Sequence, residues 1–175
     1  MFDLKLASLN REVQKLVSKS YLLKEIPTIN MEIENEDHSF SNNFKDFPNV
    51  SEDILVRLEA IGIENTIQLY EEVLTPVCRL EFSIKTGIDV DKVLILTQLA
   101  DVSRIRYVNY ILAQILLKAG YTSSQKVSNA EPIQLYNNAK KIIAEKNILE
   151  FSLGVNQFKL IIDSAKALSF DVEYD

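Results

Sequence analysis

The chain has 175 residues, 47% of them hydrophobic and 25% charged, which is typical of a globular protein with a substantial core. Its net charge of −6 argues against indiscriminate binding to nucleic acid, because such binding depends on basic side chains that neutralise phosphates. A single cysteine excludes a disulfide within the chain, and only four glycines and four prolines favour helices over tight β-turns.

Residues 1–25 predict an amphipathic helix whose apolar side chains recur at alternating spacings of four and three. The alternatives are a helix packed on its own domain and a self-association helix that uses Leu6, Leu9, Val13, Leu16 and Leu23. Charged residues are scattered through this segment, whereas a secretory signal has an uninterrupted apolar core. No apolar run in the chain approaches the roughly 20 residues that are needed to cross a bilayer. We therefore expect a cytoplasmic protein that makes no membrane contact.

Residues 26–46 predict an acidic linker that begins near Pro27. Its one cluster of metal-ligand residue types lacks the spacing of a calcium loop, so we expect no metal and no cofactor: Glu32, Glu34, Glu36, Asp37 and His38. Apolar and polar residues alternate at 29–33 and again at 168–175, which predicts two short strands. We expect these strands to form one small two-stranded β element, within the chain or with a second subunit.

The middle of the chain repeats itself, at the offset that carries Gly62 onto Gly120. Ile54 to Gly62 then lies over Leu112 to Gly120, and each copy predicts a hairpin followed by an amphipathic helix that stops at a glycine. Two more helices follow in each copy, with Pro76 and Pro132 suited to a first helical turn. They are expected at residues 76–86, 89–100, 132–146 and 155–168.

These elements predict a mainly α protein with two pseudo-symmetric helical units, residues 47–104 and residues 105–168. The expected order is an N-terminal helix (1–25), the linker (26–46), the two units and a C-terminal tail (169–175). Four short motifs in the units are specific when taken together: "TP-x-x-R" at Thr75 to Arg79, "TGI" at Thr86 to Ile88, "LADVSRI" at Leu99 to Ile105 and "AGYTS" at Ala119 to Ser123.

With these motifs, residues 47–168 resemble a widespread bacterial family of uncharacterised proteins that share a domain of unknown function. The resemblance implies tandem helix-hairpin-helix-like (SAM-like) units, a fold related to DNA-binding domains in which hairpin N–H groups face phosphate oxygens. At the matching hairpin positions this chain has Asn49 and Ser51, then Tyr107 and Asn109. Neither hairpin keeps a glycine, and a tyrosine at the point of closest approach disfavours phosphate contact.

Basic residues gather in the second unit and provide an alternative. A nucleic-acid or anion contact would use Arg104, Arg106, Lys118, Lys126, Lys140 and Lys141. The competing interpretation is a solvated surface in which Arg104 pairs with Asp101 or Glu131. Tyr107 and Tyr110 could likewise stack on bases or anchor the core.

Catalysis has little support, because His38 is the one histidine in the chain and no phosphate-binding glycine loop is present. The sequence therefore predicts a non-enzymatic protein-interaction or scaffold module that has a protein partner and forms a homo-oligomer. The alternative is a nucleic-acid-binding protein that uses the basic second unit. A small-molecule pocket between the two units is a third possibility.

Overall fold

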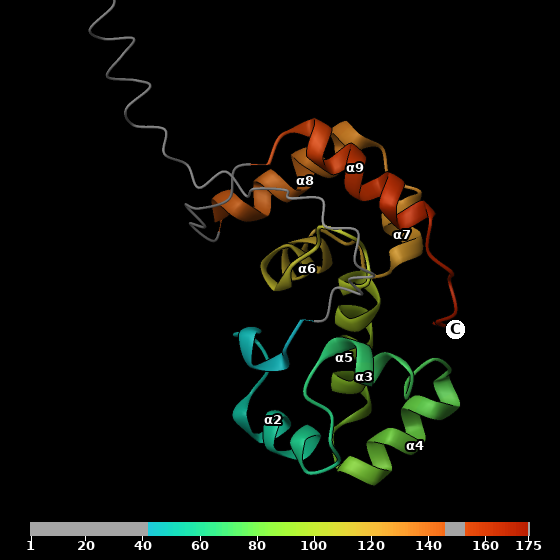
Figure 1. The fold of residues 1–175 in the computed structure, drawn as a ribbon. Coiled ribbons are helices and arrows are strands. Elements are labelled where there is room, and N and C mark those ends of the chain that lie inside the picture. Colours follow the sequence, from blue (N-terminus) through green and yellow to red (C-terminus); the bar gives the residue numbers. More distant parts are fainter. Residues whose placement is uncertain (1–41, 146–152, 175) are drawn as a thin grey trace, which may run out of the picture. The chain divides into compact units, whose positions relative to one another are not determined.

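The computed structural model describes residues 42–145 and 153–174, and these residues form eight α-helices and no β-strand (Figure 1). A short 3-10 helix, η1 (Phe44–Asp46), comes first. The helices are α2 (Glu52–Glu59), α3 (Thr66–Tyr70), α4 (Pro76–Thr86), α5 (Val90–Ser103), α6 (Tyr110–Lys118), α7 (Ser124–Ser128), α8 (Pro132–Glu145) and α9 (Val155–Lys166). The mainly α prediction is confirmed. None of these helices is both long and apolar enough to cross a membrane.

The backbone repeats at the offset that the sequence predicts. The starts of α2 and α6 are separated by the same number of positions as Gly62 and Gly120, and so are the starts of α3 and α7. The N–H of Ile63 donates to the carbonyl of Leu58 over 3.0 Å, and at the equivalent positions of the second copy Tyr121 donates to Leu116 over 2.9 Å. These bonds close the two helices in the same way.

Two glycines form the turns that these bonds close. Gly62 has a φ of 81° and Gly120 a φ of 91°, in the left-handed region where a residue without Cβ has little strain. The predicted glycine ends of both helices are confirmed. Side chains at equivalent positions are buried in both copies, for example Leu58 and Leu116.

The second half of each copy departs from the offset. Helices α4 and α8 begin at Pro76 and Pro132, as predicted, but these prolines are two positions closer together in the sequence than Gly62 and Gly120 are. Helix α5 runs to Ser103, three residues beyond its predicted end. Helix α9 ends at Lys166, two residues before its own predicted end. The repeat in the structure is therefore strict only from the hairpin to the short helix that follows the glycine.

Helix α5 is the central element of the described fold. It packs against α3, α4, α6 and α7, while α9 packs against α7 and α8. The sequence of α5 is apolar on most of its circumference, so the helix is buried on several sides. The pair α3–α5 in the first copy corresponds to the pair α7–α9 in the second.

The predicted C-terminal strand is wrong. Residues 168–174 have no strand conformation: the N–H of Leu168 donates to the carbonyl of Ala165 in α9 over 3.2 Å, and the N–H of Glu173 donates to the carbonyl of Leu74 over 2.8 Å. Side chains take the place of a partner strand, because Arg79 donates to the carbonyl of Glu173 and Arg104 to that of Ser169. The other predicted strand, the acidic cluster and the N-terminal helix lie outside the described residues.

Candidate functional site

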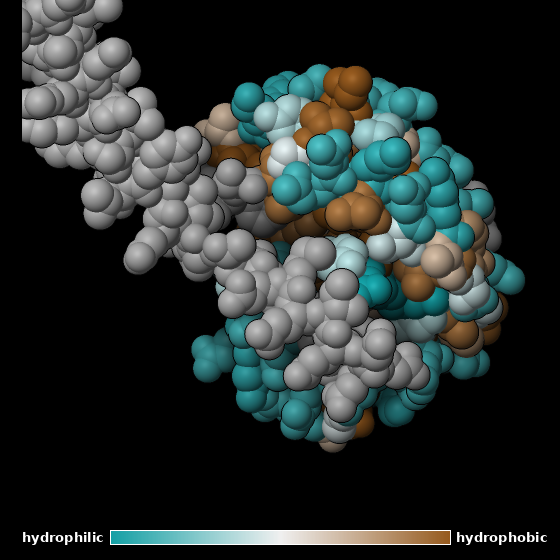
Figure 2. Space-filling model, turned by 45° about the horizontal axis from the view of Figure 1, so that its top comes forward, coloured by the Kyte–Doolittle hydropathy of each residue, from teal (hydrophilic) through white to brown (hydrophobic). Residues whose placement is uncertain are grey.

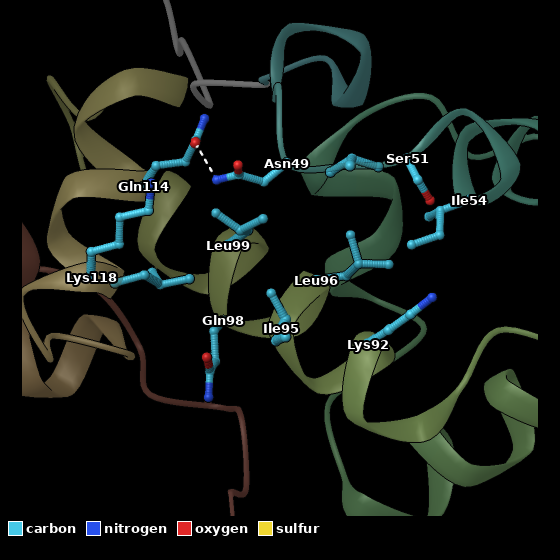
Figure 3. A pocket seen from close by; sticks show the side chains of 12 residues that line it. Asn49, Ser51, Ile54, Lys92, Ile95, Leu96, Gln98, Leu99, Gln114 and Lys118 are labelled. Carbon is cyan, nitrogen blue, oxygen red and sulfur yellow. Dashed lines mark hydrogen bonds between the residues drawn. The ribbon is translucent and has the colours of Figure 1, made fainter. Parts of the chain in front are cut away.

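An apolar groove opens on the surface where the first hairpin, α5 and α6 meet (Figure 3). Its volume is about 500 Å³. Leu96 and Leu99 of α5 form its floor, together with Val50 and Ile54 from the first hairpin and α2. Ile95 also lines the groove and is 52% exposed. Figure 2 shows that apolar side chains reach the surface in places on one face of the described fold, among larger polar areas.

Two lysines stand at the groove. Lys92 comes from the first turn of α5 and Lys118 from the last residue of α6, and in Figure 3 they lie on opposite sides of Leu96 and Leu99. Each ammonium group thus stands beside an apolar floor. An arrangement of this kind could accommodate a ligand that is apolar in the middle and anionic towards its ends.

A hydrogen bond crosses the upper edge of the groove in Figure 3. The amide of Asn49 donates to the side-chain oxygen of Gln114 over 2.7 Å. A second hollow of about 280 Å³ shares Asn49, Gln114 and Lys118 with the groove and continues towards Ile142 of α8. The bond therefore lies where two separate hollows adjoin.

Asp101 forms the buried polar centre that holds α5, α7 and the C-terminal segment (residues 167–174) together. Its carboxylate is 2% exposed and accepts hydrogen bonds from the N–H and hydroxyl of Ser124, at 2.9 and 2.7 Å, and from the hydroxyl of Tyr174 at 2.8 Å. The guanidinium of Arg104 lies 3.5 Å from the same carboxylate. A buried charge needs partners of this kind.

Arg79 is the second buried charge, and it binds carbonyl groups. It donates to Val73 at 3.0 Å, Leu74 at 3.4 Å and Glu173 at 2.6 Å. The "TP-x-x-R" motif thus serves the fold, because Thr75 caps α4 through the N–H of Cys78 and Arg79 attaches the C-terminal segment. The "LADVSRI" motif supplies Asp101 and Arg104 for the same attachment.

Two tyrosines beside this centre have raised pKa values. Burial raises the pKa of Tyr70 to about 12, and Arg104 opposes this effect in part. Burial also raises the pKa of Tyr174, and the neighbouring Asp101 adds to the increase. Both phenols therefore serve as neutral hydrogen-bonding groups, which suits structural roles.

The six basic residues of the nucleic-acid hypothesis have different environments. Arg104 is engaged by Asp101, by Ser169 and by the ring of Tyr70, whose centre lies 4.0 Å from the guanidinium. The alternative in which Arg104 pairs with Asp101 is the one observed. Lys118 lies at the groove and Lys141 is exposed. The others contact residues close to them in the sequence: Arg106 with the ring of Tyr107, Lys126 with Thr122 and Lys140 with the ring of Tyr136.

The hairpins form without glycine. Tyr107 has a φ of 72° and is the one non-glycine residue in the described ranges with a left-handed backbone. Its side chain is half-buried and packs against the core. Asn109 caps α6 by accepting from the N–H of Leu112 at 2.9 Å, whereas Ser51 precedes α2 without such a bond. Phe47 packs edge-on against Tyr110, which therefore anchors the core.

Sequence reasoning missed the groove, although it raised the possibility of a pocket between the two units. Ile95 and Lys92 were not singled out, because α5 has too little amphipathic character to indicate which of its apolar residues are exposed. In the part of the chain that the structure describes, no cluster of side chains could hold a metal ion.

The comparisons with known proteins identify a family but no relative of known activity. No curated protein and no solved structure gives a significant match to this chain. One family model matches residues 48–168, and its start lies one residue after the start that the sequence motifs predict. The match covers all the described helices apart from η1. The chain therefore belongs to the family defined by the domain of unknown function DUF4332.

Proposed function

We propose that this chain is a non-enzymatic protein-interaction module that binds a protein partner in the groove formed by the first hairpin, α5 and α6. The observation that carries the proposal is the groove itself, an apolar depression open to solvent on a helical scaffold. Proteins cover most contiguous apolar surface, so a concave apolar surface left open is typical of an interaction site. The single histidine of the sequence also supports a non-enzymatic role.

The scaffold around the groove is suited to binding with little rearrangement. Leu96 and Leu99 are both buried on α5, and Asn49 is held by Gln114. A preformed site loses less conformational entropy on binding than a mobile one does. The walls come from both copies of the repeat, so the partner would recognise the paired copies.

We further propose that the two copies are helix-hairpin-helix-like units with hairpins adapted to packing. Tyr107 takes the left-handed conformation that glycine favours, and its ring packs inward. The nucleic-acid alternative would have to use Arg106, Lys118, Lys126, Lys140 and Lys141, since Arg104 is engaged within the fold. A binding titration at low and moderate salt tests it, because phosphate contacts weaken steeply with salt.

Self-association through residues 1–25 is the other part of the proposal, and it rests on the heptad spacing of Leu6, Leu9, Val13, Leu16 and Leu23. Light scattering of the full chain is expected to give the mass of a dimer. The double substitution Leu9→Glu and Leu16→Glu is expected to give the monomer mass. A monomer mass for the unchanged chain at high concentration would remove this part and leave the groove unaffected.

Site-specific photo-crosslinking in the cells that make the protein tests the groove. A benzophenone amino acid replaces Ile95 in the groove or, as a matched control, Ile84, which is 75% exposed on α4. We expect one protein to be crosslinked at position 95 and not at position 84, and mass spectrometry identifies it. The purified partner should then bind the chain, and Ile95→Glu should weaken that binding at least about tenfold.

The outcomes separate the alternatives. A nucleic-acid adduct, or no protein adduct specific to position 95, would contradict the proposed function. Equal binding by the Ile95→Glu and Ile84→Glu variants would place the partner elsewhere and would contradict it too. Circular dichroism of both variants confirms that each remains folded, because both isoleucines are exposed and neither substitution buries a charge.

A further inference from the structure

We infer that the groove receives a single amphipathic helix of the partner, with its apolar side chains on Leu96 and Leu99 and carboxylates beside Lys92 and Lys118. This inference rests on the proposed function and names the chemistry of the partner. It follows from the charge of the lining residues, from the lack of a free strand edge in the described residues and from the length of the groove along α5.

The charge around the groove is opposite in sign to that of the molecule. The chain has a net charge of −6, yet the groove is lined by two lysines and by no aspartate or glutamate of the described residues. Neither lysine forms an ion pair with a described residue, whereas Lys45 and Lys166 do. The groove is therefore a local cationic site that favours an anionic partner.

The lining elements favour a helix over an extended peptide. One mode by which an extended peptide binds is addition to a free strand edge, and residues 42–145 and 153–174 contain no strand that could offer one. The backbone groups of α5 and α6 are bonded within their own helices. A bound segment must then satisfy its own backbone, which an α-helix does.

The length of the groove along α5 fits about two turns of such a helix. Lys92 and Leu99 are seven residues apart on α5, a distance of about 10 Å along the helix axis at about 1.5 Å per residue. Apolar side chains three and four positions apart in the partner would meet Leu96 and Leu99. Acidic residues one turn beyond them would meet the two ammonium groups.

Two synthetic peptides of equal length test the inference on the full chain. They share one leucine face and differ only in the flanking charges, which are glutamates in one and lysines in the other. By fluorescence anisotropy at low salt, we expect the acidic peptide to bind about three- to tenfold more tightly, a difference that decreases as salt is added. The charge reversal Lys92→Glu with Lys118→Glu is expected to invert the preference.

Matched controls locate the effect. The double substitution Lys85→Glu with Lys159→Glu changes two exposed lysines on α4 and α9 and makes the same change in net charge. It is expected to leave the preference for the acidic peptide in place. Ile95→Glu is expected to weaken both peptides, because it places a charge at the edge of the apolar surface.

Three results would overturn the inference. The first is equal affinity for the two peptides, the second is a preference that both double variants change equally, and the third is no binding of either peptide. A dodecanoate titration is run in parallel, and saturable binding of dodecanoate without peptide binding would assign the groove to a small apolar acid. In each of these cases, a protein crosslinked at position 95 would still support the proposed function. Failure of the helix inference can therefore be distinguished from failure of the proposed function.

Discussion

The two copies of the repeat hold their short helices by different means. In the first copy, the start of α3 pairs with the main chain: the N–H of Thr66 donates to the carbonyl of Asn42 over 3.0 Å, and the N–H of Asn42 donates to the hydroxyl of Thr66 over 3.2 Å. In the second copy, the N–H and hydroxyl of Ser124 both donate to the carboxylate of Asp101. Thr66 and Ser124 occupy equivalent positions in the two copies and both are buried.

This difference shows how a duplicated scaffold gains a new attachment. The pair between Asn42 and Thr66 is neutral and needs no further partner, whereas a buried carboxylate needs several hydrogen-bond donors. Tyr174 and Arg104 supply two of them at Asp101. Asp101 thus attaches the C-terminal segment through Tyr174, in addition to the bonds that Leu74 and Arg79 make with Glu173.

Replacing Asp101 is expected to give the largest effect. Asp101→Ala leaves Arg104 and the Ser124 N–H without their buried partner, so the free energy of unfolding should fall by about 3–5 kcal/mol. The position equivalent to Asp101 in the first copy is Asn43, an exposed side chain that caps η1. Asn43→Ala should cost about 1 kcal/mol. Urea unfolding of the two variants measures both values, and equal losses would contradict the asymmetry.

Arg79 allows a buried charge to be compared with a half-exposed one. Arg79→Met removes donors from three carbonyl groups, one of them on the C-terminal segment, and should lower the free energy of unfolding by about 2–3 kcal/mol. Arg57→Met is the matched control, because Arg57 also donates to carbonyls, those of Thr86 and Gly87, but remains half-exposed. It should cost less than about 1 kcal/mol.

Hydrogen exchange locates the loss at Arg79. The N–H of Glu173, bonded to Leu74, should exchange faster in the Arg79→Met variant and at the unchanged rate in the Arg57→Met variant. Unchanged protection of Glu173 in the first variant would show that Arg79 does not hold the segment.

The glycine turns test what the two copies share. Gly62 and Gly120 both have positive φ, and a Cβ at either position would meet no atom within 4 Å. Alanine there adds backbone strain alone, so each substitution should cost about 1–2 kcal/mol, and the two costs should agree. Thermal unfolding of the single variants measures the difference. Clearly unequal costs would contradict the equivalence of the two turns.

The strict part of the repeat was predictable because it depends on local patterns. Apolar spacing together with Gly62 and Gly120 was enough to place the helices α2 and α6 and the glycines at which they end. The left-handed conformation of Tyr107 was not predictable, because tyrosine rarely adopts it and only tertiary packing offsets its strain.

The C-terminal segment and the groove depend on contacts between distant residues. The alternation from Leu168 to Tyr174 has the period of a strand, but Arg79, Asp101 and Arg104 bind this segment through side chains from far back in the sequence. The groove likewise combines Asn49, α5 and Lys118. No local pattern contains that information, so the motifs indicated the family and not the site.

The smallest expected effect is a loss of stability in alkali. Burial raises the pKa of Tyr70 to about 12 from an ordinary value of 10.0, and burial with Asp101 raises the pKa of Tyr174. Both phenols ionise more readily in the unfolded chain, so their contribution is complete below about pH 10 and is lost as the pH rises through the folded values. Urea midpoints measured from about pH 9 to about pH 12 should fall. Tyr70→Phe should make the fall shallower, since the fold then has one fewer phenol to keep neutral. A decline equally steep in this variant would show that Tyr70 does not contribute to it, and the alkaline sensitivity would then arise elsewhere in the fold.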